Sequence, residues 1–273
     1  MKVNLPKEIQ EIGEKLNKSG FKAYLVGGSL RDILMGLEPK DWDIATDAEP
    51  EEIQKIFEES VYENTFGTVG IKTNSPENDL KIVEVTTSRK DGKYSDNRHP
   101  DKITFAKTIE EDLARRDFTV NAMALLINNK QATINELVDP FGGQGDIKKK
   151  IIKTVREPEE RFKEDALRLM RAVRFSAQLD FEIDEETKKA VKKHAKLLKN
   201  IAEERIRDEF QKIIMTERAG WAIYELENLG LLEYIIPELR EGINCGQNKH
   251  HIYTVFEHNV RALNYTVEKN YSF

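Results

Sequence analysis

The spacing of apolar residues changes near residue 140, and this change limits the folds that the chain can adopt. Before it, short strand-like runs such as Ala23–Val26 and Lys81–Thr87 alternate with segments of helical spacing. The run Asp139-Pro140-Phe141-Gly142-Gly143 breaks regular structure. From Gly145 onward amphipathic helical segments follow one another with no convincing strand. The sequence therefore predicts an α+β fold, in which a head domain over residues 1–140 combines a small mixed sheet with helices and precedes an all-helical remainder.

Length, charge and cysteine content exclude several classes of protein. A chain of 273 residues suffices for two domains and part of a third. The longest purely apolar run, Ala122–Ile127, is far shorter than the roughly 20 residues of a membrane span, and no charged-then-apolar leader opens the chain. The single cysteine, Cys245, excludes an internal disulfide, so we expect a cytoplasmic protein. The net charge of −6 argues against indiscriminate coating of nucleic acid but allows a local basic face.

Two glycines and two aspartates form the first candidate site. Gly27-Gly28 follow the run Ala23–Val26 and open a helical segment, where backbone N–H groups and the helix N-terminus favour a phosphate. Arg31 lies in the first turn and is placed to clamp a phosphate. Asp41 and Asp43 are two residues apart, so on a strand both carboxylates face one way and supply the oxygen ligands that Mg²⁺ prefers. An ordinary tight turn and solvated loop carboxylates are the alternatives for each pair taken alone.

A cationic segment is the second candidate site. Residues 146–175 hold ten Lys or Arg and six Asp or Glu in a chain of net charge −6. On a helix that includes Asp165, apolar residues form one stripe, and Arg168, Arg171 and Arg174 form another on the opposite side. No acidic residue follows Asp165 over the next turns, so we expect these arginines to lack acidic partners four residues further along. The stripe suits a triphosphate or an RNA backbone, and the alternative is a solvated basic face.

Three ordered blocks give the chain a family resemblance. They are Gly27–Gly36 with Asp41–Thr46, then Arg115–Ala124, then Glu164–Phe175. These blocks resemble the motifs of the class II tRNA nucleotidyltransferases, namely the CCA-adding enzymes and bacterial poly(A) polymerases of the DNA polymerase β-like superfamily. The resemblance covers about residues 20 to 240.

The resemblance implies a head, neck and body. The head is the nucleotidyltransferase domain over residues 1–140, and the helical neck over residues 141–206 selects the nucleotide base. A helical, tRNA-binding body over residues 207–273 follows. We expect this body to be incomplete, because the last helical pattern runs to Phe273 without a capping signal.

The same resemblance implies an activity and residue roles. The activity is Mg²⁺-dependent addition of nucleotides from CTP and ATP to the 3′ end of tRNA, so tRNA, CTP and ATP are the expected partners and no membrane is involved. Asp41 and Asp43 are the expected catalytic residues and metal ligands. Glu84 is a candidate third carboxylate, and Asp117 and Asn121 are expected to hold the local structure or the sugar. The expected nucleotide-binding residues are Gly28, Arg31, Arg116, Asp165, Arg168, Arg171 and Arg174.

The spacing of Asp165 and Arg168 suggests how a base is chosen. Residues three apart on a helix are neighbours, and an aspartate only accepts hydrogen bonds whereas an arginine only donates them. Cytosine and adenine each present an amino donor beside a ring acceptor, while guanine and uracil present a ring donor beside a carbonyl acceptor. One Asp/Arg pair therefore matches C or A and mismatches G and U, which agrees with the family's templateless selection of CTP and ATP.

Two polar regions have weaker functional signals. The segment Ser88–Asp101 is expected to be a loop; in the family a loop here is kept in enzymes that add the terminal A, so its presence favours full CCA addition without excluding an A-only enzyme. His250, His251 and His258 lie close together in a stretch that resembles the beginning of an HD phosphohydrolase domain. The His-Asp pair that defines such a domain is absent, so we expect structural or surface histidines and assign no activity.

Three rival functions remain at this stage. A poly(A) polymerase or an A-only enzyme of the same family shares all these motifs. An RNA-binding protein with an inactive head belongs to a different class, and the retained Asp41, Asp43 and arginines argue against it. A small-molecule nucleotidyltransferase would share the head but has no need for so long a basic helical extension. Oligomeric state cannot be predicted from the sequence.

Overall fold

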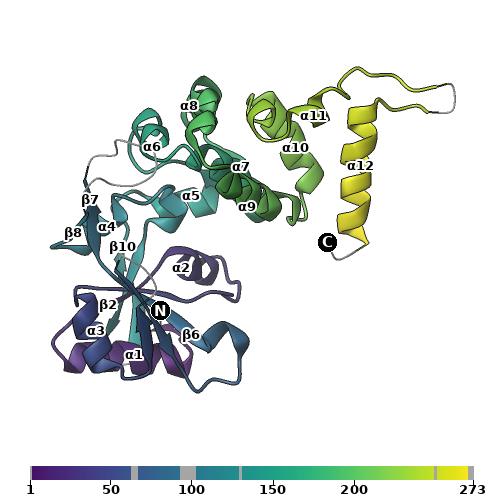
Figure 1. Ribbon diagram of the computed structural model, residues 1–273. Helices are drawn as coiled ribbons and strands as arrows, with labels where there is room; N and C mark the ends of the chain where they lie inside the picture. The colour runs from purple at the N-terminus through teal and green to yellow at the C-terminus, as the bar shows by residue number, and fades with distance from the viewer. Residues whose placement is uncertain (1, 63–66, 93–102, 129–130, 249–250, 270–273) are drawn as a thin grey trace. The chain divides into compact units, whose positions relative to one another are not determined.

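The computed structural model describes residues 2–62, 67–92, 103–128, 131–248 and 251–269. These residues separate into two compact units, one up to Lys149 and one from Lys150 onward (Figure 1). Unit 1 holds a mixed sheet with helices, and unit 2 is almost entirely helical. The predicted α+β class, with a sheet-containing head followed by helices, is confirmed.

The central sheet of unit 1 has eight strands among the described residues. Strands β3 and β6 pair in parallel, and the other neighbours pair antiparallel, so the sheet is mixed. Strands β5 and β6 pair antiparallel on either side of the turn-rich segment Asn74–Asn78. In spatial order the strands are β1 (Lys2–Val3), β10 (Gln131–Val138), β9 (Ala124–Asn128), β2 (Ala23–Val26), β3 (Asp43–Thr46), β6 (Ile82–Thr87), β5 (Thr68–Lys72) and β4 (Ser60–Tyr62).

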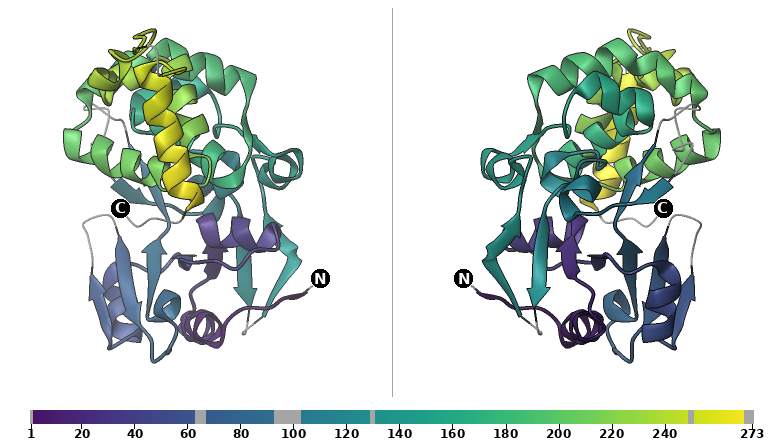
Figure 2. Two further views of the ribbon diagram at one scale, coloured as in Figure 1. Left: turned by 90° about the vertical axis from the view of Figure 1, so that its right-hand side faces the viewer. Right: turned by 90° about the vertical axis from the view of Figure 1, so that its left-hand side faces the viewer.

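The two faces of this sheet carry separate apolar clusters. On one face α1 and α3 pack over alternating strand residues such as Leu25, Ile44 and Val85, and both views of Figure 2 show α1 in purple beside the strands. On the other face α4 contributes to a smaller cluster that includes Val26 and Ala45. The helices of unit 1 are α1 (Lys7–Lys18), α2 (Gly27–Leu34), α3 (Pro50–Ile56), α4 (Ile109–Leu113) and α5 (Gly143–Lys149), with 3₁₀ turns η1 (Asn78–Leu80) and η2 (Thr119–Asn121).

The segment after Ser88 is not wholly a loop, which corrects the prediction. Strand β7 (Arg89–Asp91) lies within the segment and pairs antiparallel with β8 (Ile103–Phe105), which follows the segment. No strand pattern marks Arg89–Asp91, because these three residues carry no apolar side chain. Residues 93–102, the centre of the predicted loop, lie outside the described residues.

Helix α5 belongs with the sheet-containing unit, although the predicted boundary near residue 140 put it with the helical part. Asp139 receives hydrogen bonds from the N–H groups of Gly143 and Gln144 at 2.7 and 2.9 Å, which caps the helix. Thr119 Oγ1 donates to Asp146 at 2.7 Å. Gly143 lies so close to Thr119 that a Cβ would be 2.2 Å from the Thr119 carbonyl oxygen. These contacts bind α5 to η2, and the division therefore falls after Lys149.

Among its described residues, unit 2 contains helices and one short parallel pair of strands, which corrects the expectation of no strand beyond Gly145. Asn264 of α12 accepts from the Gly220 N–H at 2.9 Å and holds α12 against α10 (Figure 1). No helix among the described residues is long and apolar enough to cross a membrane. The elements are β11 (Ile151–Ile152), α6 (Pro158–Glu164), α7 (Arg168–Leu179), β12 (Glu182–Ile183), α8 (Glu185–His194), η3 (Ala195–Asn200), α9 (Glu203–Ile214), α10 (Ala219–Asn228), η4 (Leu232–Tyr234), α11 (Pro237–Arg240) and α12 (Val255–Glu268).

Candidate nucleotide site

Gly27 marks the point where strand β2 gives way to helix α2. Its φ of +69° lies in the left-handed region, where glycine is favoured, and it turns the chain sharply after Val26. Ser29 Oγ donates to the Val26 carbonyl at 2.9 Å and fixes the turn. A Cβ at Gly27 would lie 3.0 Å from Asp43 Oδ2 and 3.2 Å from Arg116 Nη1. The absent side chain therefore brings backbone, carboxylate and guanidinium together.

The two aspartates lie at the beginning of strand β3. Asp43 is the first residue of the strand, whereas Asp41 occupies a bend just before it, so the prediction that both belong to the strand is wrong for Asp41. Trp42 between them is 7% exposed and packs into the core on the other side. Burial raises the pKa of Asp43 above its ordinary value; Arg116 lowers this pKa and the negative charge of Asp41 raises it further. The two carboxylates therefore lie close enough to repel each other.

Glu84 lies opposite Asp43 in the parallel register of β3 and β6. Its neighbours Val83 and Val85 are buried in the core, so Glu84 is on the same face of the sheet as Asp43. Among the described residues no group of three or more His, Cys, Asp or Glu side chains is arranged to hold a metal ion. Glu84 is therefore placed beside the aspartate pair, and its role as a third ligand stays a prediction.

Asp112 organises the arginine pair, and sequence reasoning missed it. Its carboxylate accepts from Arg115 Nε at 2.9 Å and from Arg116 Nη2 at 3.1 Å, and it also accepts from the Arg89 N–H at 3.2 Å. Burial alone raises the pKa of this 1% exposed carboxyl, but Arg116, Arg115 and the Arg89 N–H together hold it below its ordinary value. The available signal was the helical spacing of an aspartate three and four residues before two arginines.

Asn121 connects Arg116 to Arg31. Its side-chain oxygen accepts from Arg31 Nη1 at 2.9 Å, and its backbone carbonyl accepts from Arg116 Nη1 at 3.4 Å. Arg31 is 5% exposed and also donates to Asp32, at 2.7 and 2.8 Å. A Cβ at Gly28 would lie 3.6 Å from Arg31 Nη2. Arg31 lies in the last turn of α2 and not in the first turn, which corrects the prediction, because the helix already begins at Gly27. Its guanidinium is held by Asp32 and Asn121.

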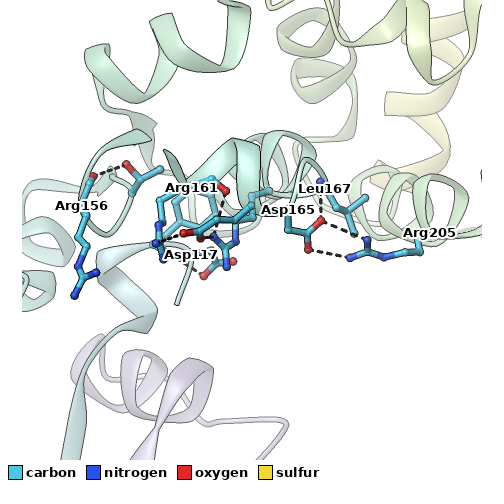
Figure 3. Close-up of polar contacts among 10 residues, drawn as sticks. Asp117, Arg156, Arg161, Asp165, Leu167 and Arg205 are labelled. Carbon is cyan, nitrogen blue, oxygen red and sulfur yellow. Dashed lines mark hydrogen bonds and ion pairs between the residues drawn. The ribbon is translucent and has the colours of Figure 1, made fainter. Parts of the chain in front are cut away.

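Asp165 does not lie on the arginine helix, which corrects the predicted geometry. Helix α6 ends at Glu164, α7 begins at Arg168, and Asp165 between them has extended backbone angles of −140° and 106°. Its carboxylate accepts from the Leu167 N–H at 3.1 Å and from both terminal nitrogens of Arg205 at 3.3 and 2.9 Å (Figure 3). Arg205 comes from α9, far along the chain, so local spacing gave no signal for this partner.

The three arginines of α7 have partners, contrary to the expectation of a free cationic stripe. Arg168 donates to Glu164, four residues before it, at 2.7 Å and to the Arg161 carbonyl at 3.2 Å. Arg174 is 8% exposed, pairs with the buried Glu209 of α9 at 2.9 Å and lies over the ring of Phe175. The guanidinium of Arg171 lies 5.1 Å from the same ring. These acidic partners precede the arginines or come from another helix, namely Glu164 and Glu209, so the absence of acidic residues just after Asp165 did not exclude them.

The histidines near the C-terminal end provide no metal centre in the described part of the chain. The rings of His251 and His258 are 6.4 Å apart and perpendicular, and His250 lies outside the described residues. Asp117, the remaining predicted residue, accepts from the Phe118 N–H at 2.9 Å and is 8% exposed.

A glycine-led helix beside an aspartate pair and an arginine, on a mixed sheet, is the arrangement of a nucleotidyltransferase domain. Two family patterns agree: residues 23–153 match the poly A polymerase head domain, and residues 180–243 match the probable RNA and SrmB-binding site of polymerase A. The chain therefore belongs to the family of poly(A) polymerases and CCA-adding enzymes, a nucleotidyltransferase family that is generally metal-dependent.

Known relatives support this placement. The chain is 43% identical to the CCA-adding enzyme of Ligilactobacillus salivarius over 85% of its own length and 55% of that protein, and 44% identical to that of Geobacillus thermodenitrificans over 83% and 54%. It thus spans about half the length of the curated relatives it matches.

A solved structure of the Bacillus stearothermophilus CCA-adding enzyme in complex with CTP has a TM-score of 0.75 and 36% identity, covering 94% of this chain and 57% of that one. A tRNA nucleotidyltransferase complexed with a primer tRNA and an incoming ATP analog has a TM-score of 0.67 and 29% identity, covering 86% of this chain and 66% of that one.

Proposed function

We propose that this chain is the nucleotidyltransferase portion of a CCA-adding enzyme, which adds C and A from CTP and ATP to the 3′ end of tRNA without a nucleic-acid template. The observation that carries the proposal is the close approach of Asp43 and Arg116 to the backbone at Gly27, at the end of β2. A carboxylate for metal and a cation for phosphate meet there at a helix N-terminus. The similarity to CCA-adding enzymes extends over 85% of the chain.

Asp41 and Asp43 fit a Mg²⁺ site and are the proposed catalytic residues and metal ligands. Both offer the hard oxygen atoms that Mg²⁺ takes. The raised pKa of Asp43 means that its negative charge is disfavoured in the folded chain, and a nearby cation would stabilise that charge. When bound, Mg²⁺ would supply activation of the tRNA 3′-hydroxyl and neutralisation of the leaving pyrophosphate. Glu84 stands beside this pair as the proposed third carboxylate.

Arg116 is the proposed phosphate ligand of unit 1, with Gly28 and Arg31 beside it. Asp112 and Asn121 orient the guanidinium of Arg116 before any ligand arrives, so binding a triphosphate requires little side-chain ordering. The backbone at Gly28 leaves space for close approach of a ligand to the N-terminus of α2. Arg31 acts mainly by holding this corner together, because Asp32 and Asn121 already occupy its donors.

Asp165 and Arg168 are the proposed base-selecting residues of unit 2, with Arg171 and Arg174 as further nucleotide ligands. The carboxylate of Asp165 accepts from the amino group of cytosine or adenine, and Arg168 donates to the neighbouring ring nitrogen. Arg205 holds Asp165, and Glu164 holds Arg168, so the acceptor and the donor keep fixed positions. A guanine or uracil would then place its carbonyl oxygen, an acceptor, against the acceptor Asp165, and a hydrogen bond would be lost.

The proposal extends to domain roles and location. The catalytic head, predicted over residues 1–140, extends to Lys149 with helix α5. The base-selecting neck follows up to residue 206, and residues 207–273 form part of a tRNA-binding body. Backbone phosphates and shape are the expected basis of tRNA recognition by these helices. A cytoplasmic location, expected from the single exposed cysteine, is part of the same proposal.

The test uses a tRNA transcript that ends before its CCA sequence. It is incubated with Mg²⁺ and each nucleoside triphosphate in turn, and the products are resolved nucleotide by nucleotide. We expect addition of two C from CTP, followed by one A from ATP. Asp41→Asn and Asp43→Asn should each abolish addition and keep tRNA binding, while Asp47→Asn, at an exposed position after the same strand, should leave it unchanged.

The outcomes also separate the rival functions. A long A tract made from ATP alone would overturn CCA addition in favour of a poly(A) polymerase. Addition of A only to a transcript that already ends in CC would favour an A-only enzyme. Binding of tRNA with no addition from any triphosphate would identify an RNA-binding protein with an inactive head.

A further inference from the structure

Strand β4 forms one edge of the central sheet, and its outer side has no neighbouring strand among the described residues. It pairs with β5 in antiparallel register, with Val61 opposite Gly70. The ladder begins one residue before the strand, because the Lys72 N–H donates to the Glu59 carbonyl at 2.9 Å. The outer side of β4 is therefore a place where a further strand can add to the sheet.

The backbone polar groups of Ser60 and Tyr62 point to this outer side. Hydrogen-bonded and non-hydrogen-bonded pairs of residues alternate along an antiparallel ladder. Glu59 and Lys72 form a hydrogen-bonded pair, so Val61 belongs to the next such pair. Ser60 and Tyr62 lie between and beyond these pairs, and their N–H and C=O groups are directed away from β5. Two donors and two acceptors thus have the spacing that an added strand requires.

The side chains of β4 leave apolar surface on both faces of this edge. Val61 is 51% exposed and Tyr62 is 43% exposed, and successive residues of a strand point to opposite faces. Natural edge strands are protected by short length, lysine, proline or a bulge. The segment Ser60–Tyr62 is short but contains no lysine, proline or bulge. An added strand would cover both exposed side chains.

The charge of the surrounding segment determines which partner suits β4. Residues 47–62 hold six acidic residues and one lysine, which gives a net charge of −5 in a chain of net charge −6. Glu51, Glu58 and Glu59 are exposed and form no ion pair with another described residue. Such a segment repels the phosphates of RNA, and it repels the same segment of a second copy of the chain. It therefore favours a cationic protein segment.

A cavity of about 580 Å³ lies beside the beginning of β4. It is lined by residues of α1, of the end of α3 and of the end of β5. The buried side chains of Ile12, Phe57 and Ile71 provide its apolar floor. Its rim holds lysines and glutamates in equal number, so it favours neither sign of charge. A strand that runs along β4 and past Glu59 would reach this cavity and place an apolar side chain in it.

We propose that β4 is a docking edge for an extended, cationic segment of another protein, which adds to the sheet as a further strand. Ser60 and Tyr62 provide the main-chain hydrogen bonds, and Val61 packs against apolar residues of the partner. The carboxylates of Glu58 and Glu59 attract its lysine or arginine side chains. The docking edge lies three strand positions from β3, so this inference does not depend on the proposed function.

The probe for this edge is a synthetic peptide of about eight residues in which valine and lysine alternate. Two matched peptides serve as controls. The first carries N-methyl groups on consecutive amides, which removes the main-chain donors and keeps the charge. The second has glutamate in place of each lysine. Binding to the full chain is measured by fluorescence anisotropy, and the backbone amide signals of the isotope-labelled chain locate the site.

Two pairs of variants test the backbone and the charge separately. Tyr62→Pro removes an N–H that faces away from β5, a position where an edge strand tolerates proline, and Tyr62→Val keeps that N–H as its matched control. The double variant Glu58→Gln with Glu59→Gln is compared with Glu77→Gln with Asp79→Asn, which removes the same charge from exposed positions between β5 and β6. Circular dichroism checks folding, and the charge variants keep the test valid if the proline variant does not fold.

We expect the peptide of valine and lysine to bind the wild-type chain and to shift the amide signals of Ser60 and Tyr62 most. Tyr62→Pro should bind at least about fivefold more weakly than Tyr62→Val, because a main-chain hydrogen bond is lost. The double variant of Glu58 and Glu59 should bind about threefold more weakly than its control, with a smaller dependence on salt. Both control peptides should bind the wild type at least about tenfold more weakly.

Other results overturn the inference. No binding at about 1 mM peptide, or equal affinity for the N-methylated peptide, would exclude strand addition. Equal affinities of Tyr62→Pro and Tyr62→Val, or signal shifts confined to other strands, would exclude β4 as the docking edge. A molecular mass that rises with concentration in the wild type but not in Tyr62→Pro would assign the edge to a second copy of the chain. The proposed function fails on different grounds, namely absence of nucleotide addition, because these measurements involve no catalysis.

Discussion

Replacing Asp112 by Asn should strongly destabilise unit 1, because this buried carboxylate faces two guanidinium groups. Asp112 is 1% exposed and accepts from Arg115 at 2.8 Å and Arg116 at 3.1 Å. Breaking a buried ion pair costs about 3–5 kcal/mol. Asparagine keeps one acceptor oxygen but turns an NH₂ group toward a cation, so we expect about 3 kcal/mol. With a urea dependence of about 2 kcal/mol per M, the unfolding midpoint should fall by about 1.5 M.

The two tryptophans make this measurement specific to one unit. Trp42 lies in the core of unit 1, and Trp221 lies in unit 2. In a Trp221→Phe background, the fluorescence of Trp42 reports the unfolding of unit 1 in urea. Glu111→Gln is the control, because it removes a charge from the neighbouring position of α4 whose side chain is 36% exposed. We expect it to cost less than about 1 kcal/mol.

The pH dependence provides a second test with a fixed sign. The pKa of Asp112 is held below its ordinary value in the folded chain. Its stabilising contribution is therefore fully present above about pH 4, and it is lost as the pH falls through the folded pKa. The difference in unfolding free energy between wild type and Asp112→Asn should stay constant from about pH 5 to 8 and shrink below it. A destabilisation no larger than that of Glu111→Gln would refute the reasoning.

Three further perturbations test other parts of the site. Gly27→Ala should reduce nucleotide incorporation by about tenfold or more, because a Cβ there would lie 3.0 Å from Asp43 Oδ2. The control is Gly20→Ala, where the space around a Cβ is open. Equal rates of incorporation by the two variants would contradict the expectation. Asp43→Asn should stabilise unit 1 at pH 7 in EDTA, because the raised pKa of Asp43 means that folding disfavours its charged form. A urea midpoint lower than that of the wild type would reject this expectation. Arg205→Ala should lower the kcat/KM preference for CTP and ATP over UTP and GTP by about tenfold, because Arg205 holds Asp165. The control is Arg207→Ala, which removes a guanidinium that bonds Asp208. An unchanged ranking of the four nucleotides in Arg205→Ala would exclude this role.

Local sequence patterns predicted the part of the site that local structure builds. The glycines follow β2, and the Asp-x-Asp pair lies at the beginning of the adjacent strand β3, so the order of strand, turn and helix indicated this corner of the site correctly. Asp112 was within reach of the same reasoning, because its spacing to Arg115 and Arg116 is that of a helical turn. Its burial was not predictable, because an acidic residue in the first turn of a helix is usually a solvated one.

Long-range partners could not be predicted from one sequence. Arg205 contacts Asp165 from 40 residues further along the chain, and Glu209 contacts Arg174 from 35 residues further along. No periodicity specifies such a pairing. The position of Asp165 failed for a related reason. Its hydrophobic neighbours continue the helical spacing on both sides, so the pattern does not reveal that the helix stops at Glu164 and restarts at Arg168.

The short pairing of β11 with β12 determines how the segment between them can open. Ile151 and Ile152 meet Glu182 and Ile183 in parallel register, and backbone bonds from Glu182 to Lys150 at 2.9 Å and from Asp184 to Ile152 at 3.0 Å close the ring. Helices α6 and α7 are thus tied at both ends. The start of α6 and the end of α7 both lie near the β11–β12 pairing, so neither helix can fray there as a free terminus would. The amides of residues 158–179 should therefore exchange with solvent in one cooperative opening. The contacts that hold the arginines of α7 would break together in that opening.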